Sequence, residues 1–251
     1  MSGSKAPAKS RLDVALVERG LADSRAKAQA LVLAGVVYSG ERRLDKPGLP
    51  IAGDQPLELR GQDHPWVSRG GLKLAHALDH FSIDPRGGTW LDIGASTGGF
   101  TDVLLARGAA KVYAVDVGHG QLAWKLRQDV RVVVLERTNA RHLSRGEIPQ
   151  PLDGIVCDAS FIGLETVLPA PLALASPGAR LIALIKPQFE VGPADVGKGG
   201  IVRDPALHER VCARIADWLA RQPGWAVLGV TDSPITGTDG NREFLIAAKR
   251  G

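Results

Sequence analysis

The chain has 251 residues, of which 44% are hydrophobic, and its formal net charge is +4. This length can hold one large domain or a medium domain with a small one. No apolar run approaches the ~20 residues of a membrane span, and the polar N-terminus lacks the apolar core of a signal peptide. We therefore expect a cytoplasmic protein without a membrane partner. Cys157 and Cys212 are too few for a disulfide framework or a metal cluster, and no metal is expected.

Positive charge is concentrated in the N-terminal quarter of the chain. Residues 1–60 contain 10 Lys and Arg against 7 Asp and Glu, whereas the rest contains 21 against 20. A basic segment of this kind can bind a polyanion such as nucleic acid. A solvated charged surface explains the same counts equally well.

The first sixty residues predict a small α+β module. Residues 1–10 have the composition of a disordered terminus. Apolar spacing predicts a helix over 11–20 that Gly20 ends, and Ser24 can cap a second helix that runs to Ala34. Short strands are expected at 36–38 and 57–59. Because so short a segment buries little core, we expect an appended domain at 10–60 and a polar linker at 61–67.

Residues 68–251 predict a larger α/β domain. Apolar strands are expected at 89–93, 112–115, 132–135, 154–157, 181–185, 225–230 and 244–248. Helices are expected between them, most clearly at 100–107 and at 205–220, where a proline stands in the first turn. This alternation is typical of a doubly wound, mostly parallel sheet. The short connection between the last two strands allows them to pair antiparallel.

A glycine-rich turn, DIGASTGGF at 92–100, follows the first strand of this domain. Glycines at the carboxyl edge of a sheet let a ligand approach the backbone closely. Asp116 ends the next strand, 24 positions after Asp92, where it can accept hydrogen bonds from a ribose diol. Together they indicate a nucleoside-containing cofactor. A nicotinamide site would look similar, but the usual G-x-G-x-x-G pattern is absent.

The same turn also matches the G-x-S-x-G nucleophile elbow of hydrolases, with Ser96 as the nucleophile. That elbow normally follows several earlier strands of its sheet, and here none is predicted. Three histidines, His119, His142 and His208, are expected on exposed turns and helix surfaces rather than in a triad. The sequence therefore favours a cofactor site over a hydrolase.

Four charged residues are expected at one edge of the sheet. Asp158 and Lys186 directly follow predicted strands, Lys73 lies on a helical stretch, and Glu243 begins the last strand. A lysine after a buried strand is costly unless it is paired or used. Two lysines and two carboxylates near a cofactor suit proton removal from a weakly acidic hydroxyl. The alternative is a structural ion pair between Asp158 and Lys186.

Several motifs resemble known families. The stretch RLDVALVERGLADSR at 11–25, with AGVV at 34–37, resembles the S4 RNA-binding domain. The second domain resembles the FtsJ-like ribose methyltransferases. Residues 11–249 as a whole resemble the TlyA family, long labelled hemolysins and understood as rRNA 2′-O-methyltransferases. The motifs that carry this resemblance are WVSRGGLKL at 66–74, DIGASTGGFT at 92–101, DVGHGQLAW at 116–124, ERTNAR at 136–141, DASFI at 158–162 and KPQFE at 186–190.

The resemblance implies a Rossmann-like class I methyltransferase sheet, S-adenosylmethionine as cofactor, and ribosomal RNA or ribosomal subunits as partner. The implied catalytic tetrad is Lys73, Asp158, Lys186 and Glu243. The implied cofactor ligands are Asp92, Gly94, Ser96, Gly98, Phe100, Asp116 and Asn139. The expected RNA-binding residues are Arg11, Arg25, Lys27, Arg42, Arg43 and Arg69. Related members carry an arginine where this chain has His64, which puts in doubt a coupling of the domains through that side chain.

The resulting hypothesis is in-line methyl transfer to the ribose 2′-hydroxyl of a cytidine, without a metal and with Lys186 as base. This role requires the pKa of Lys186 to fall from ~10.4 to about 7–8, which burial and the charge of Lys73 would favour. The alternatives are a membrane-active hemolysin and a non-catalytic rRNA-binding assembly factor. The glycine-rich loop 190–204 either orders on RNA or is an ordinary mobile loop. The sequence carries no signal for an oligomeric state.

Overall fold

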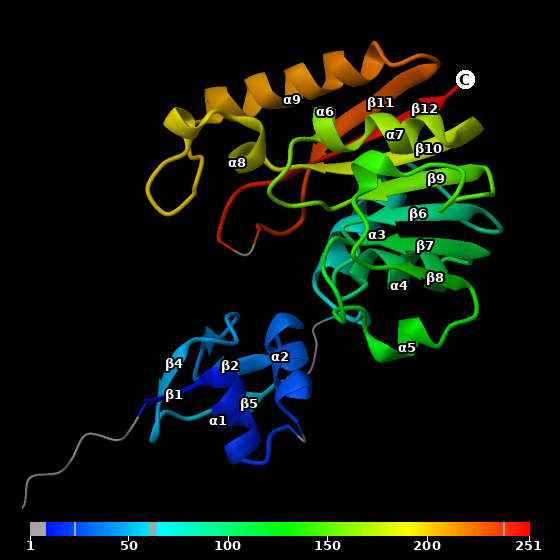
Figure 1. Cartoon of the computed structure of the whole chain (residues 1–251). Helices are drawn as coiled ribbons and strands as arrows, with labels where there is room; N and C mark the ends of the chain where they lie inside the picture. Colours follow the sequence, from blue (N-terminus) through cyan, green and yellow to red (C-terminus); the bar gives the residue numbers. More distant parts are fainter. Residues whose placement is uncertain (1–8, 23, 61–63, 238) are drawn as a thin grey trace, which may run out of the picture. The chain divides into compact units, whose positions relative to one another are not determined.

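The computed structural model describes residues 9–22, 24–60, 64–237 and 239–251. The chain forms two compact units, one that ends at Arg69 and one that spans Gly70–Gly251 (Figure 1). The domain limits expected from the sequence, 10–60, 61–67 and 68–251, stay predictions, and residues 61–63 of the expected linker lie outside the described residues. Of the expected disordered terminus, residues 1–8 also lie outside them.

The first unit packs two helices against short antiparallel strands. Ser24 caps the second helix by accepting a hydrogen bond from the backbone N–H of Lys27, as the sequence predicts. The expectation of disorder is wrong for residues 9 and 10, because they belong to a strand in which Ser10 pairs with Ile51. The elements are β1 (Lys9–Arg11), α1 (Leu12–Glu18), α2 (Arg25–Leu33), β2 (Val37–Ser39), β3 (Arg42–Arg43), β4 (Pro50–Ala52) and β5 (Glu58–Leu59).

The second unit contains a seven-stranded sheet within the described residues, in the order β11-β12-β10-β9-β6-β7-β8. All neighbouring pairs are parallel except those of β12, which is antiparallel to both β10 and β11. The predicted Rossmann-like methyltransferase sheet with an antiparallel last strand is confirmed. The strands are β6 (Thr89–Ile93), β7 (Lys111–Val115), β8 (Val132–Leu135), β9 (Leu152–Cys157), β10 (Ala175–Ile185), β11 (Trp225–Asp232) and β12 (Phe244–Arg250).

Helices cover both faces of this sheet. In Figure 1, α3 and α4 lie on one face, and α6, α7 and α9 lie on the other. Pro205 stands in the first turn of α9 and Asp204 caps it by accepting from the N–H of Ala206. The helical segments are α3 (Gly70–His80), α4 (Gly99–Ala106), α5 (Trp124–Arg127), η1 (Ala140–His142), α6 (Leu164–Val167), α7 (Pro169–Ala173), α8 (Pro187–Glu190), η2 (Pro193–Asp195) and α9 (Pro205–Ala220).

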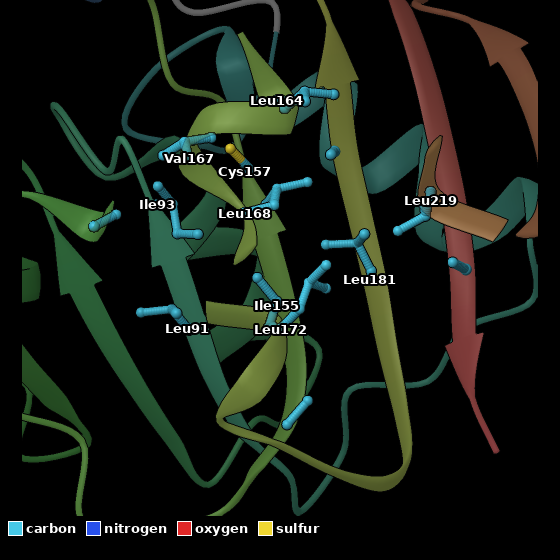
Figure 2. Close-up of a cluster of buried hydrophobic side chains, with 14 of the residues drawn as sticks. Leu91, Ile93, Ile155, Cys157, Leu164, Val167, Leu168, Leu172, Leu181 and Leu219 are labelled. Carbon is cyan, nitrogen blue, oxygen red and sulfur yellow. The ribbon is translucent and has the colours of Figure 1, made fainter. Parts of the chain in front are cut away.

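A hydrophobic core fills the space between the sheet and the helices α6, α7 and α9 (Figure 2). Alternate residues of the central strands contribute to it, among them Ile93 of β6 and Ile155 of β9. Leu168, between α6 and α7, and Leu219 of α9 belong to the same cluster on the helical side. Because both faces of the sheet are covered, its strands are almost continuously apolar. The core therefore fixes the strand ends that carry the polar residues.

The turns after β6 and β9 are packed against each other. Gly94 has φ +78°, and a side chain on it would meet the backbone N and Cα of Ala159 at 2.9 Å. The N–H of Asp158 donates to the carbonyl oxygen of Ile93 at 2.9 Å. Glycine is thus required here both for its conformation and for the close approach. The packing holds two predicted site segments, 94–98 and 158–162, at the same sheet edge.

Candidate active site

The four residues of the expected tetrad lie together at the carboxyl edge of the sheet. Lys186 Nζ is 2.6 Å from Asp158 Oδ1. Lys73 Nζ is 2.6 Å from Glu243 Oε2 and 3.9 Å from Asp158 Oδ2. The charges therefore alternate along one chain of contacts, from Lys186 through Asp158 and Lys73 to Glu243. Helix α3 supplies Lys73, and the other three residues stand at the ends of β9, β10 and β12.

The tetrad is buried except at Asp158. The side chains of Lys73 and Lys186 are 8% exposed and that of Glu243 is 3% exposed, whereas Asp158 is 21% exposed. Buried charges are tolerated when each has a partner of opposite sign and hydrogen bonds. Two cations and two anions satisfy this condition. The site therefore opens to solvent at Asp158 and is closed behind it.

The ammonium of Lys186 donates to the Asp158 carbonyl oxygen at 3.0 Å and to Ser160 Oγ at 2.9 Å, and it also forms an ion pair with Asp158 Oδ1. Burial lowers the pKa of Lys186, but the charge of Asp158 and its hydrogen bond raise it, and the pKa lies above its usual value. The expected fall of this pKa is therefore wrong here. The nearest charge to Lys186 is the carboxylate, not the ammonium of Lys73.

A cavity of about 700 Å³ adjoins the tetrad at Asp158. Apolar side chains such as Ile93, Val115 and Ile162 form part of its wall, and a pocket of this size and character suits a small organic ligand. The expected cofactor residues that line the cavity are Gly94, Ser96, Asp116 and Asn139. These four residues, from the turns after β6, β7 and β8, thus lie around one cavity.

Two backbone N–H groups fix the carboxylate of Asp116. Ser96 N donates to Asp116 Oδ2 at 2.8 Å, and Gly118 N donates to Oδ1 at 2.7 Å. Ser96 adopts φ +48°, which turns its N–H toward the end of β7. Each carboxylate oxygen keeps a lone pair for a further donor. The residues present therefore fit a nucleoside whose ribose diol binds Asp116.

Three other expected cofactor residues lie outside the cavity wall. Asp92 is fully buried, receives a hydrogen bond from Thr101 Oγ1 at 2.6 Å, and has its pKa raised by burial to about 7. Gly98, at φ +96°, has no room for a side chain, because one would overlap Leu126 Cδ1. Phe100 is buried in α4. Ile93 lines the cavity and Asp92 does not, since the two side chains point to opposite faces of the sheet.

The sequence reasoning missed several residues of the cavity wall. Gln121 accepts a hydrogen bond from Ser96 Oγ at 3.2 Å, and Ser160 accepts one from Lys186. Phe161 is 89% exposed at φ +65°, with its ring 5.0 Å from that of Phe189. Their positions could have indicated them, because these residues stand within the motifs at 116–124, 158–162 and 186–190.

The arrangement gives the hydrolase alternative no nucleophile. The hydroxyl of Ser96 bonds to the amide of Gln121, which cannot act as a general base. His208, expected on a helix surface, is instead buried, with Nε2 3.0 Å from the carbonyl oxygen of Val202. His119 and His142 are exposed as expected. Across the described part of the chain, no cluster of three or more His, Cys, Asp or Glu residues could hold a metal ion.

The expected RNA-binding residues of the first unit differ in their exposure and contacts. Arg11 and Arg25 donate to the buried carboxylate of Asp13, with Nε–O distances of 3.0 and 2.9 Å, and both keep more than half of their side-chain surface exposed. Lys27, Arg42 and Arg43 are exposed. Arg69, the last residue of this unit, is partly buried.

No helix within the described ranges is long and apolar enough to cross a membrane.

Comparisons with known proteins agree with this architecture. The model of the FtsJ-like methyltransferase family matches residues 66–250, and that of the S4 domain matches residues 10–55. YqxC of Bacillus subtilis, named as a candidate rRNA methyltransferase, is 52% identical over 95% of this chain and 85% of its own. The 16S/23S rRNA (cytidine-2′-O)-methyltransferase TlyA of Mycobacterium tuberculosis is 49% identical over 95% of this chain and 89% of its own.

A solved structure supports the same assignment. A candidate hemolysin from Streptococcus thermophilus superposes with a TM-score of 0.74 and 42% identity, over 98% of this chain and 90% of that one. The chain therefore belongs to the FtsJ-like methyltransferase family and, within it, to the TlyA family.

Proposed function

We propose that this protein is an S-adenosylmethionine-dependent 2′-O-methyltransferase that modifies the ribose of a cytidine in ribosomal RNA in the cytoplasm. The observation that carries the proposal is the contact chain from Lys186 to Glu243, which opens at Asp158 into a cavity that also contains Asp116. The names of the relatives TlyA and YqxC point to the same substrate class.

The cavity supplies the groups that would hold S-adenosylmethionine. Asp116 would accept hydrogen bonds from the ribose diol, Gly94 and Ser96 would lie against the ligand, and Asn139 would contribute a polar edge. When bound, this cofactor supplies an electrophilic methyl group on a positively charged sulfur. The four residues lie on the side of the sheet edge where doubly wound folds bind nucleotides.

Lys186 would orient the ribose 2′-hydroxyl and accept its proton. At neutral pH the raised pKa keeps Lys186 charged, so it first binds the hydroxyl oxygen as a donor. Beside the positive charge of a bound cofactor, the pKa of Lys186 would fall toward the range useful for a base, and Lys186 would release one proton to solvent. The neutral amine could then take the hydroxyl proton while the oxygen forms its bond to the methyl carbon.

The other tetrad members would hold Lys186 in place. Asp158 binds Lys186 directly, Lys73 lies between the carboxylates of Asp158 and Glu243, and Glu243 balances the charge of Lys73. A fixed geometry between hydroxyl and methyl group provides much of the rate enhancement in such transfers. The first unit would supply affinity for RNA through phosphate contacts and shape recognition.

The test is transfer of radiolabelled methyl from S-adenosylmethionine to purified, unmodified small and large ribosomal subunits. We expect label in one or both subunits, mapped to a 2′-oxygen, and none with Lys186→Ala. Lys186→Arg should be almost as inactive, because a guanidinium cannot accept the proton. Near-full activity of Lys186→Arg with normal RNA binding would show that Lys186 is not the base.

The same assay tests the first alternative, and a liposome assay tests the second. A non-catalytic assembly factor would bind subunits without transferring label from the wild-type protein. A membrane-active hemolysin would release dye from liposomes when prepared free of nucleic acid. We expect methyl transfer and no dye release.

A further inference from the structure

The ammonium of Lys186 has a partner outside the tetrad. Asp158 holds it in two ways, through an ion pair with its carboxylate and through a hydrogen bond from the ammonium to its main-chain carbonyl oxygen. Another N–H group of Lys186 donates to Ser160 Oγ at 2.9 Å. Ser160 lines the cavity and is exposed, whereas Lys186 is buried. Ser160 thus stands between the buried lysine and the space that a substrate hydroxyl must enter.

The backbone around Ser160 is held from both sides. The preceding residues, Asp158 and Ala159, pack against Gly94, where a side chain would come within 2.9 Å of Ala159. The next residue, Phe161, has φ +65°, a costly conformation for a large side chain that persists only where its surroundings impose it. The position of the Ser160 hydroxyl therefore follows from the fold of the segment.

A buried carboxylate ties this segment to the helix that follows Lys186. Glu190, in α8, accepts a hydrogen bond from the N–H of Leu164 at 2.8 Å. Arg214 of α9 donates to Glu190 Oε2 at 2.9 Å. The segment that follows Ser160 and the helix that follows Lys186 are thereby both connected to the Glu190–Arg214 ion pair. This arrangement restricts how far the two groups can move apart.

A hydroxyl at this place can change its hydrogen-bond partner more easily than a carboxylate can. Ser160 Oγ can accept from the ammonium while donating its own hydrogen, and its hydrogen bond is easier to replace than the ion pair with Asp158. An entering alcohol has the same chemistry as Ser160. It can replace Ser160 as the acceptor of this N–H without disturbing the ion pair and the hydrogen bond to Asp158.

We propose that Ser160 is a positioning residue for methyl transfer, which directs one N–H group of Lys186 into the cavity and gives it up to the ribose 2′-oxygen. This inference rests on the proposed function. In the transfer itself Ser160 neither gains nor loses a proton. The N–H proton that faces the 2′-oxygen first leaves to solvent, so that the neutral amine of Lys186 presents its lone pair to the hydroxyl. The 2′-hydroxyl proton then goes to this amine, the oxygen–methyl bond forms, and the methyl–sulfur bond breaks with its electron pair on sulfur.

The test compares Ser160→Ala and Ser160→Thr with wild type in steady-state methyl transfer across pH. Ser160→Ala should lower kcat about 10- to 100-fold, as expected for loss of a hydrogen bond to a charged group, with little change in KM for S-adenosylmethionine. Ser160→Thr, which keeps a hydroxyl, should recover most of the rate. Removing an acceptor from the ammonium lowers the pKa of Lys186, so the rise of kcat with pH should move to lower pH in Ser160→Ala.

Ser96→Ala is the matched comparison, because Ser96 lines the same cavity but bonds to Gln121. It should change KM for the cofactor without moving the pH dependence. A wild-type rate and pH profile in Ser160→Ala would overturn the inference while methyl transfer by wild type upholds the function. Loss of cofactor binding in Ser160→Ala would also overturn it, since Ser160 would then be a cofactor ligand. Absence of transfer by wild type would reject the function and the inference together.

Discussion

Lys73 and Glu243 are 170 positions apart in the chain, yet their charged groups meet at 2.6 Å in a buried site. Lys73 lies on α3, which precedes the sheet in the chain. Its partner, Glu243, stands directly before the last strand, β12. Gly237 leaves room for Glu243, because a side chain there would come within 2.5 Å of Oε1. The ion pair thus joins the first and last elements of the second unit.

Removal of Lys73 should destabilise the second unit as well as stop catalysis. In Lys73→Met, Glu243 is left buried without a cation, which costs about 3–5 kcal/mol of unfolding free energy. The double variant Lys73→Met/Glu243→Gln should regain most of that stability but no methyl transfer. Urea unfolding and radiolabel transfer measure the two effects. An unchanged urea midpoint in Lys73→Met would mean that the buried pair contributes nothing to stability.

Asp158 should control the pH at which Lys186 works. Its carboxylate raises the pKa of Lys186, so Asp158→Asn should lower that pKa. The rise of kcat with pH should therefore occur at lower pH in the variant, while the maximal rate falls because Lys186 is held less firmly. The pH–rate profile at saturating cofactor measures this. If the maximal kcat fell but the midpoint of its rise with pH stayed the same, the titration would belong to another group.

Asp116 should contribute to cofactor affinity. In Asp116→Asn one oxygen becomes an NH₂ group that faces the N–H of Ser96 or Gly118, and the charge that favours the ribose diol is lost. We expect the Kd for S-adenosylhomocysteine to rise about 10- to 100-fold, the size of a hydrogen bond to a charged group. Titration calorimetry measures it, and a Kd within threefold of wild type would place the ribose elsewhere.

Asp92 should make the protein less stable as the pH rises. Burial raises its pKa to about 7, so between ~4 and ~7 the folded state keeps a proton that the unfolded state releases. The free energy of unfolding then falls with pH, on the order of 1.4 kcal/mol per unit for this group. Asp92→Asn removes this dependence. In urea unfolding, the stability of the variant relative to wild type should be higher at pH 8 than at pH 5. The same stability difference at both pH values would contradict the raised pKa.

Asp13 should organise the basic surface of the first unit. Hydrogen bonds from Arg11 above all, then from Gln29 and Arg25, hold the pKa of Asp13 well below its usual range. Because the folded-state pKa is lowered, its stabilisation is complete above ~3.9 and is lost as the pH falls below that value. Asp13→Asn should therefore weaken both unfolding stability and rRNA affinity at neutral pH.

The control for Asp13 is Lys27→Ala, which removes one exposed charge from the same unit. It should lower rRNA affinity and the salt dependence of binding while leaving the unfolding transition in place. If Asp13→Asn changed stability alone, the arrangement of Arg11 and Arg25 would have no part in RNA binding.

The strands of the second unit were predictable because their signals are local. The apolar run at 89–93 has the same limits in the structure, since glycines and a tight turn surround it. The strand predicted at 181–185 begins six residues earlier, at Ala175, because the Ser-Pro-Gly at 176–178 hides its first half. In the first unit, β1 was missed because its residues, Lys9 to Arg11, are polar and are held by pairing with β4.

The site was only partly predictable, because chemistry at close range depends on geometry. The sequence placed four charged residues at one sheet edge, but it could not show that Asp158 is nearer to Lys186 than Lys73 is, and so the pKa of Lys186 moves in the opposite direction. Ser160 was missed because its contact depends on the path of the backbone after Asp158. Asp92 was expected in the cofactor site but lies outside the cavity wall. Strand alternation could have shown this, because it directs Asp92 and Ile93 to opposite faces of the sheet.

The distance in sequence between Lys73 and Glu243 also has a consequence during synthesis. A nascent chain that has been translated as far as α8 already contains Lys73, Asp158 and Lys186, but it lacks the anion that balances Lys73. The strand that carries Glu243 into place, β12, must then insert between β10 and β11. The complete set of four charges thus cannot assemble until Glu243 has left the ribosome that made it.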